Sequence, residues 1–142
     1  MVYQISVFLE NRAGQLAEIT KVLAENGVDL RAISIAETSD YGILRMIVDN
    51  AQNATGILMH HGYLMTMTPV QVVSVPDIPG GIAPVLGALA SGHIDIEYMY
   101  SLFTHVAGKA YMVFRVADAD KFTAVLAAQG IIPADADELG IC

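Results

Sequence analysis

Two short glycine-containing loops carry the residue types that could bind a small anion. They are ENRAGQL at residues 10–16 and PDIPGGI at residues 76–82. Each loop lies between a strand-like and a helix-like segment. Its backbone N–H groups therefore lie beside the positive end of a helix dipole, and this position favours binding of a carboxylate. Gly14, Gly80 and Gly81 lack a Cβ and let a ligand approach the backbone. A purely structural interpretation stays open, because glycine is a common turn residue and Asn or Asp a common helix cap.

The two loops occupy equivalent places in a repeat. The segment VFLENRAGQLAEITKVLAENGVDLRAI, which begins at Val7, returns 66 residues later as VSVPDIPGGIAPVLGALASGHIDIEYM, which begins at Val73. At the same offset, Gly42 falls on Gly108. Such a repeat indicates a duplicated unit. Pro69 separates the last strand of the first copy from the first strand of the second, so the linker is almost absent. We therefore predict two small units, residues 1–68 and residues 69–142.

Hydrophobic periodicity assigns the same order of elements to both units. Residues 3–9 alternate as in a strand, and from Leu16 the apolar residues repeat at helical spacing as far as Gly27. A strand hairpin, a second helix capped by Asn50 and a fourth strand, YLMTMT, complete the first unit. In the second unit Asp118 caps the last helix, and PADADEL is predicted to hold a short last strand. The fold class is therefore α+β: two tandem ferredoxin-like βαββαβ units with antiparallel sheets and helices on one face.

Composition argues against several classes of function. The chain has 142 residues and a formal net charge of −8, and its seven Lys and Arg residues are scattered singly. This pattern speaks against nucleic-acid and membrane partners. The one cysteine, Cys142, excludes a disulfide framework, and without a signal-peptide pattern we expect a cytoplasmic protein. Units of about 70 residues are marginally stable alone, so we expect a shared interface and a homodimer.

Motifs for catalysis and metal binding are missing from the sequence. It has neither GxxxxGK[ST] nor HExxH, and no local signature of a Ser-His-Asp or Cys-His site. His60 and His61 are adjacent, and neighbours on a helix point about 100° apart, unlike a chelating i, i+4 pair. We therefore expect no catalytic residues, no cofactor and no metal site.

The loops and the strands that follow them resemble the ACT domain family. The matching segments are ENRAGQL and GVDLRAI in the first unit, and PDIPGGI and HIDIEYM in the second. ACT domains are small regulatory modules attached to many enzymes of amino-acid metabolism. The resemblance covers the chain as a tandem pair, although the first loop lacks the proline that the family usually has. It implies binding of a free amino acid at an interface between units or subunits, without catalysis.

The resemblance also implies which residues contact the amino acid. Backbone N–H groups of the loops would bind its carboxylate, while Asn11, Asp77, Asp29 and Asp95 would accept hydrogen bonds from its ammonium group. The side-chain pocket would be lined by Leu30, Ala32, Ile33, Ser34 and Ile35, or by Ile96, Tyr98, Met99, Tyr100 and Ser101. The predicted ligand-binding residues are Asn11, Arg12, Ala13, Gly14, Gln15, Leu16, Asp29, Ile33, Asp77, Ile78, Pro79, Gly80, Gly81, Ile82, Asp95 and Met99.

The leading functional hypothesis is a stand-alone regulatory protein that senses a free amino acid. Ligand binding would bias the protein toward one arrangement through its differential affinity for that arrangement. The alternative hypothesis is a non-catalytic subunit of a separate amino-acid biosynthetic enzyme, with a vestigial ligand site. A purified sensor must respond to free ligand, whereas an obligate subunit must associate with its enzyme.

Overall fold

The computed structural model describes residues 1–10, 12–37, 40–103 and 106–142. The chain forms two compact units. The N-terminal unit comprises Tyr3–Thr68 and Gly140–Cys142, and the C-terminal unit comprises Pro69–Leu139 and Met1–Val2. The chain passes from one unit to the other between residues 68 and 69, but the first two residues and the last three each belong to the opposite unit from the one that the repeat predicts.

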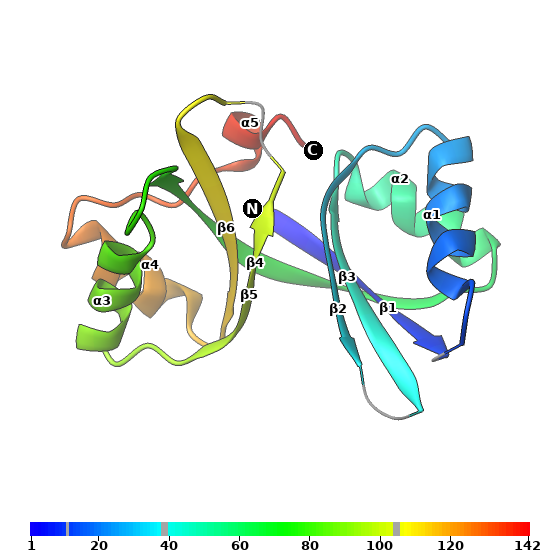
Figure 1. Ribbon diagram of the computed structural model, residues 1–142, viewed down its shortest axis with the longest axis horizontal. Coiled ribbons are helices and arrows are strands. Elements are labelled where there is room, and N and C mark those ends of the chain that lie inside the picture. Colours follow the sequence, from blue (N-terminus) through cyan, green and yellow to red (C-terminus); the bar gives the residue numbers. More distant parts are fainter. Residues whose placement is uncertain (11, 38–39, 104–105) are drawn as a thin grey trace. The chain divides into compact units, whose positions relative to one another are not determined.

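The N-terminal unit has the predicted order of elements. They are β1 (Val2–Glu10), α1 (Gln15–Glu25), β2 (Leu30–Glu37), β3 (Tyr41–Val48), α2 (Ala51–His60) and β4 (Leu64–Pro76). The strands follow the order β2-β3-β1-β4, and β3 is antiparallel to both β1 and β2. Helices α1 and α2 cover the same face of this sheet (Figure 1).

Apolar side chains on that face and on the two helices build the core of the N-terminal unit. Alternation along β1 buries Ile5, Val7 and Leu9, because successive strand residues point to opposite faces. Ile19 and Leu23 lie four residues apart on α1 and are both buried against this cluster. The start of α2 is also as predicted, since Asn50 Oδ1 accepts a hydrogen bond from the backbone N–H of Asn53 at 3.1 Å.

The C-terminal unit repeats this plan around its own core. Its elements are the second part of β4, α3 (Ala83–Ser91), β5 (Ile96–Leu102), β6 (Lys109–Val116), α4 (Ala119–Ala127) and α5 (Ala136–Leu139). The strand order is β4-β6-β5, with antiparallel pairs. The core residues are Val73, Val75, Val85, Leu89, Phe114, Val116, Phe122 and Leu126. Pro84 lies in the first turn of α3, where its missing N–H costs little.

Two predictions about strands were wrong. Pro69 does not end a strand, because β4 continues from Leu64 to Pro76 as one strand of 13 residues. PADADEL holds a helix instead of a last strand: Asp135 accepts a hydrogen bond from the N–H of Glu138 at 2.8 Å and so favours the helical turn α5. A single backbone hydrogen bond, from Ala134 N–H to Val72 O at 2.8 Å, lies where the missing ladder was expected.

The register within each unit corrects the alignment of the two hairpins. Ile33 pairs with Met46 in the N-terminal unit, and Met99 pairs with Phe114 in the C-terminal unit. The first residues of these pairs are 66 positions apart and the second residues are 68 apart, so the β5–β6 hairpin has two additional residues. Gly42 therefore corresponds to Ala110, and not to Gly108 as the sequence alignment predicted.

The tandem ferredoxin-like α+β fold itself is confirmed. Both units place antiparallel strands beneath two helices, and Figure 1 shows α3 and α4 together on one face of the C-terminal sheet. Across the part of the chain that the structure describes, no helix is long and apolar enough to cross a membrane.

Candidate ligand site

The loop after β1 leads directly into α1 and contains the first group of predicted site residues. Gly14 precedes the helix with a φ of 85°, in the left-handed region that glycine adopts without a steric penalty. The backbone N–H of Arg12 donates to Glu10 O at 2.9 Å. The predicted residue Asn11 lies outside the described residues, while Ala13 and Gly14 are exposed beside it.

A small cavity of about 70 Å³ lies between this loop, the end of β1 and the β2–β3 hairpin. Its lining residues are Leu9, Glu10, Arg12, Gln15, Leu16, Ile35, Glu37 and Gly42. The strand register explains this grouping, because Gly42 is paired with Leu9 on one side and with Glu37 on the other. Glycine at this crossing point leaves room above the sheet for the neighbouring side chains.

The amide oxygen of Gln15 distinguishes this cavity. Within the described residues, Gln15 Oε1 is a buried side-chain atom with no hydrogen-bond partner. A buried acceptor that is left unsatisfied costs about 1–3 kcal/mol, so native proteins rarely keep one without a purpose. Because this oxygen is itself buried, a ligand with an N–H or O–H donor would reach it once the Gln15 side chain turns toward the cavity that it lines.

Arg12, which lines the cavity, lies near two glutamates. The guanidinium of Arg12 lies 3.5 Å from Glu10 and 3.9 Å from Glu18, measured from Nε to Oε2 and from Nη2 to Oε2. Tyr63 donates a hydrogen bond from its hydroxyl to Glu18 Oε1 at 3.2 Å. Burial, together with the charge and hydrogen bond of Glu18, raises the pKa of Tyr63 above its ordinary value. Glu18 thus contacts both the exposed side chain of Arg12 and the hydroxyl of Tyr63.

Part of this site was predicted from the sequence and part was missed. Arg12, Gln15 and Leu16 were predicted, and Ile35 was expected from the strand that follows α1. Leu9, Glu10, Glu37 and Gly42 were missed, although the hairpin register carries the signal that brings them together. Ile33 does not line the cavity, because it lies two residues before Ile35 on β2, opposite Met46.

Asp29 lies at the other end of α1 from Gln15. The helix has 11 residues, and at 1.5 Å per residue it separates its two ends by about 16 Å. The backbone N–H of Asp29 donates to Asp49 Oδ1 at 3.0 Å, and its carboxylate lies 4.0 Å from Arg31 Nε. Within the N-terminal unit, Asp29 is therefore not brought to the cavity at Gln15.

The loop before α3 folds back on itself. Three of its backbone N–H groups are bonded: Asp77 donates to Gly108 O in the adjacent hairpin at 2.9 Å, and within the loop Gly81 donates to Ile78 O at 3.0 Å and Ala83 to Gly80 O at 3.2 Å. A Cβ on Gly81 would overlap the carbonyl oxygen of Pro76. Of the other predicted residues here, Ile78, Pro79 and Gly80 are exposed, and Ile82 packs against the core of the C-terminal unit.

The remaining predicted residues of the C-terminal unit are also separated from this loop. Asp95 borders a cavity of about 170 Å³ at the far end of α3, which it lines with His93, Ile94, Ala117, Asp118 and Lys121. Met99 packs against the core of the unit. Asp118 is occupied as the cap of α4, since its Oδ1 accepts from Lys121 N–H at 3.0 Å.

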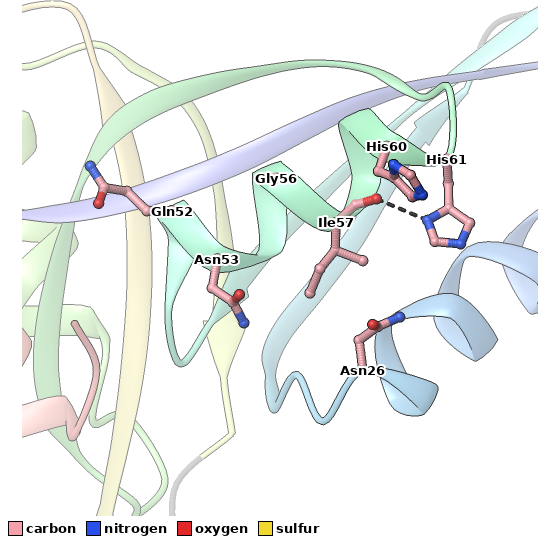
Figure 2. A pocket seen from close by; sticks show the side chains of 7 residues that line it. All are labelled: Asn26, Gln52, Asn53, Gly56, Ile57, His60 and His61. Carbon is pink, nitrogen blue, oxygen red and sulfur yellow. Dashed lines mark hydrogen bonds between the residues drawn. The ribbon is translucent and has the colours of Figure 1, made fainter.

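Figure 2 shows a wider, open cavity of about 390 Å³ between the end of α1 and helix α2. His61 Nδ1 is 2.9 Å from Ile57 O, and Asn26 Nδ2 donates to Val22 O at 2.8 Å, so both side chains are already bound to their own helices. The rings of His60 and His61 meet edge to face, with centroids 5.5 Å apart. Within residues 1–10, 12–37, 40–103 and 106–142, no three His, Cys, Asp or Glu side chains could hold a metal ion together.

Fold and site together define a pair of small α+β modules with a polar cavity at a strand-to-helix loop. The family model described as "ACT domain pair" matches residues 1–138, and the chain therefore belongs to the ACT domain family. Protein BT0572 from Bacteroides thetaiotaomicron is 39% identical to this chain, with a TM-score of 0.88 over 98% of this chain and 95% of that one.

Two more distant crystal structures share the fold. They are the regulatory subunits of aspartate kinase from Thermus thermophilus, in its ligand-free form, and from Thermus flavus. The first is 21% identical, with a TM-score of 0.67 over 91% of each chain. The second is 22% identical, with a TM-score of 0.63 over 89% of this chain and 88% of that one. No curated protein matches the sequence.

Proposed function

We propose that this ACT domain pair is a non-catalytic regulatory protein and that a free amino acid binds at the Gln15 cavity. Because the cavity measures only about 70 Å³, the ligand would extend from it to an interface with a second subunit. The observation that carries the proposal is the buried Oε1 of Gln15, which has no hydrogen-bond partner among the described residues. The ammonium group of an amino acid supplies three N–H donors, and a charged donor makes a stronger hydrogen bond than a neutral one.

The other lining residues fit the remaining parts of an amino acid. Arg12 and the backbone N–H groups at the start of α1 would bind the carboxylate. Glu10 and Glu37 would add negative charge beside the ammonium group, and Leu9, Leu16 and Ile35 would contact an aliphatic side chain. Asn11, Asp29 and Ile33 stay proposed ligand contacts of the N-terminal unit. The second loop, Asp95 and Met99 would be the contacts of an equivalent site if the C-terminal unit also bound an amino acid.

The regulatory role rests on likeness of fold. Two proteins of this fold are named as regulatory subunits of aspartate kinase. The chain would act in the cytoplasm as a homodimer, and ligand binding would favour one conformation by the difference in its affinity for the alternatives. Light scattering of the purified protein, with and without ligand, would measure the oligomeric state.

A thermal-shift screen against the twenty free L-amino acids, each at millimolar concentration, tests this function. A ligand that binds only the folded state must raise the melting temperature. The Gln15→Leu variant should weaken binding about tenfold or more, because a hydrogen bond to a charged group contributes about 1.5–3 kcal/mol. Gln52→Leu is the matched control, since Gln52 occupies the first turn of α2.

Two results would contradict the proposal. The first is a folded wild-type protein that responds to none of the twenty amino acids. The second is a Gln15→Leu variant that binds as tightly as the Gln52→Leu control.

A second candidate function is that of an interaction subunit for a separate amino-acid biosynthetic enzyme. It is favoured by exposed apolar side chains at one end of the C-terminal unit, where Ile78 is 64% exposed and Phe103 is 55% exposed. Such a subunit would change the activity of a purified biosynthetic enzyme on mixing, without any response to free amino acids.

A further inference from the structure

We infer that amino-acid binding is confined to the N-terminal unit, so that the duplicated protein holds no more than one ligand per chain. This inference rests on the proposed function of the Gln15 cavity. It departs from the symmetry of the repeat, which predicts two related sites.

The corrected register identifies the residues that correspond to the cavity lining. The offset is 66 up to the end of β5 and 68 in β6, as the strand pairs of each unit require. The equivalents of Leu9, Glu10, Arg12 and Gln15 are Val75, Pro76, Ile78 and Gly81. The equivalents of Leu16, Ile35, Glu37 and Gly42 are Ile82, Ser101, Phe103 and Ala110.

This correspondence shows a one-sided loss of polar groups. The four polar lining residues of the N-terminal unit are Glu10, Arg12, Gln15 and Glu37. Their equivalents are Pro76, Ile78, Gly81 and Phe103, none of which carries a charge or a side-chain hydrogen-bonding group. The second position therefore lacks equivalents of the Arg12 cation, the Gln15 amide and the two glutamates, and burying the charges of a zwitterion without such partners is costly.

The backbone of the second loop is also committed. Three of its N–H groups are bonded within the loop or to the adjacent hairpin, at Asp77, Gly81 and Ala83. No side chain could replace the missing glutamine at Gly81, since a Cβ there would overlap Pro76 O. These three N–H groups are therefore not available to a carboxylate, and the second position has no counterpart of the Gln15 amide oxygen, which could accept from an ammonium group.

Isothermal titration calorimetry of the full chain with each of the twenty L-amino acids tests this asymmetry. For any amino acid that binds, we expect at most one molecule per chain. We expect at least tenfold weaker binding in Gln15→Leu, and also in Gln15→Gly, which installs the residue of the second loop. Phe103→Ala alters only the second position, so this variant should bind like the wild type. Circular dichroism checks that each variant is folded.

Two molecules bound per chain would overturn the inference and leave the proposed function standing. A loss of binding in Phe103→Ala as large as that in Gln15→Leu would do the same. The absence of binding by all twenty amino acids to the folded wild type would instead contradict the proposed function itself.

Discussion

At the scale of single residues, each unit places a tyrosine hydroxyl beside a glutamate. In the C-terminal unit Tyr111 is 3% exposed, and its neighbours are Ser74 and Glu138. Burial raises the pKa of Tyr111 above its ordinary value of 10.0; the hydrogen bond to Glu138 and its charge act in the same direction, while the hydrogen bond from Ser74 lowers it. Because Glu138 belongs to α5, the group that raises the pKa of Tyr111 together with burial comes from the short last helix.

The Tyr111→Phe variant should lose about 1 kcal/mol of stability at pH 8. The neutral phenol is favoured in the folded state, so its contribution is complete below pH 10 and declines as the pH rises through the raised pKa. The stability difference between wild type and variant should therefore shrink above about pH 10. Urea unfolding of both proteins at pH 8 and pH 11 measures this difference in the free energy of unfolding. Tyr3→Phe, at a 40% exposed position, is the control, and a difference that grows with pH would contradict the assignment.

At the scale of elements, Gly81 before α3 is crowded by neighbouring backbone, whereas Gly87 within α3 has open space beside it. Gly81 lies just before the helix, where a Cβ would overlap the carbonyl oxygen of Pro76. Gly87 lies within α3 and is exposed, and no atom beyond its own helix backbone lies within 4 Å of where a Cβ would stand. The same substitution should therefore change stability in opposite directions at the two positions.

Gly81→Ala should destabilise the protein by about 1–3 kcal/mol, because the added methyl group has to displace backbone. Gly87→Ala should stabilise it by about 0.5–1 kcal/mol, since alanine loses less conformational freedom in a helix. Chemical denaturation of both variants beside the wild type measures the two changes. Equal changes in the free energy of unfolding, or a Gly81→Ala variant as stable as the wild type, would mean that Gly81 does not approach the carbonyl oxygen of Pro76 as closely as described.

The elements also show what the sequence could and could not predict. The caps at Asn50 and Asp118 were predicted because a capping hydrogen bond depends on residues only three positions apart. The continuity of β4 through Pro69 was not predicted, because proline in a sequence usually indicates the end of a strand. Whether a strand tolerates proline depends on its position in the sheet, which the local sequence does not specify. The cavity at Gln15 was predicted for its loop but not for Glu37 and Gly42, which depend on the pairing of distant strands.

At the scale of the whole molecule, the last residues of the chain belong to the N-terminal unit. Ile141 is 8% exposed, and the backbone N–H of Cys142 donates to Asp49 O at 2.8 Å. Ile141→Ala should lower the free energy of unfolding by about 2 kcal/mol. The control is Ile132→Ala, at an 82% exposed position, which should change stability very little. Urea unfolding compares them, and equal effects would show that the chain end does not contribute to the unit.

The exchange of chain ends between the units has a consequence for dissecting the protein. A fragment of residues 1–68 would lack Gly140–Cys142, and a fragment of residues 69–142 would lack Met1–Val2. The same cut would sever β4 in its middle. Neither half of the coding sequence therefore specifies a complete folding unit, and the two fragments should regain structure only when they are mixed. Each copy of the ancestral duplication is thus completed by residues that the other copy encodes.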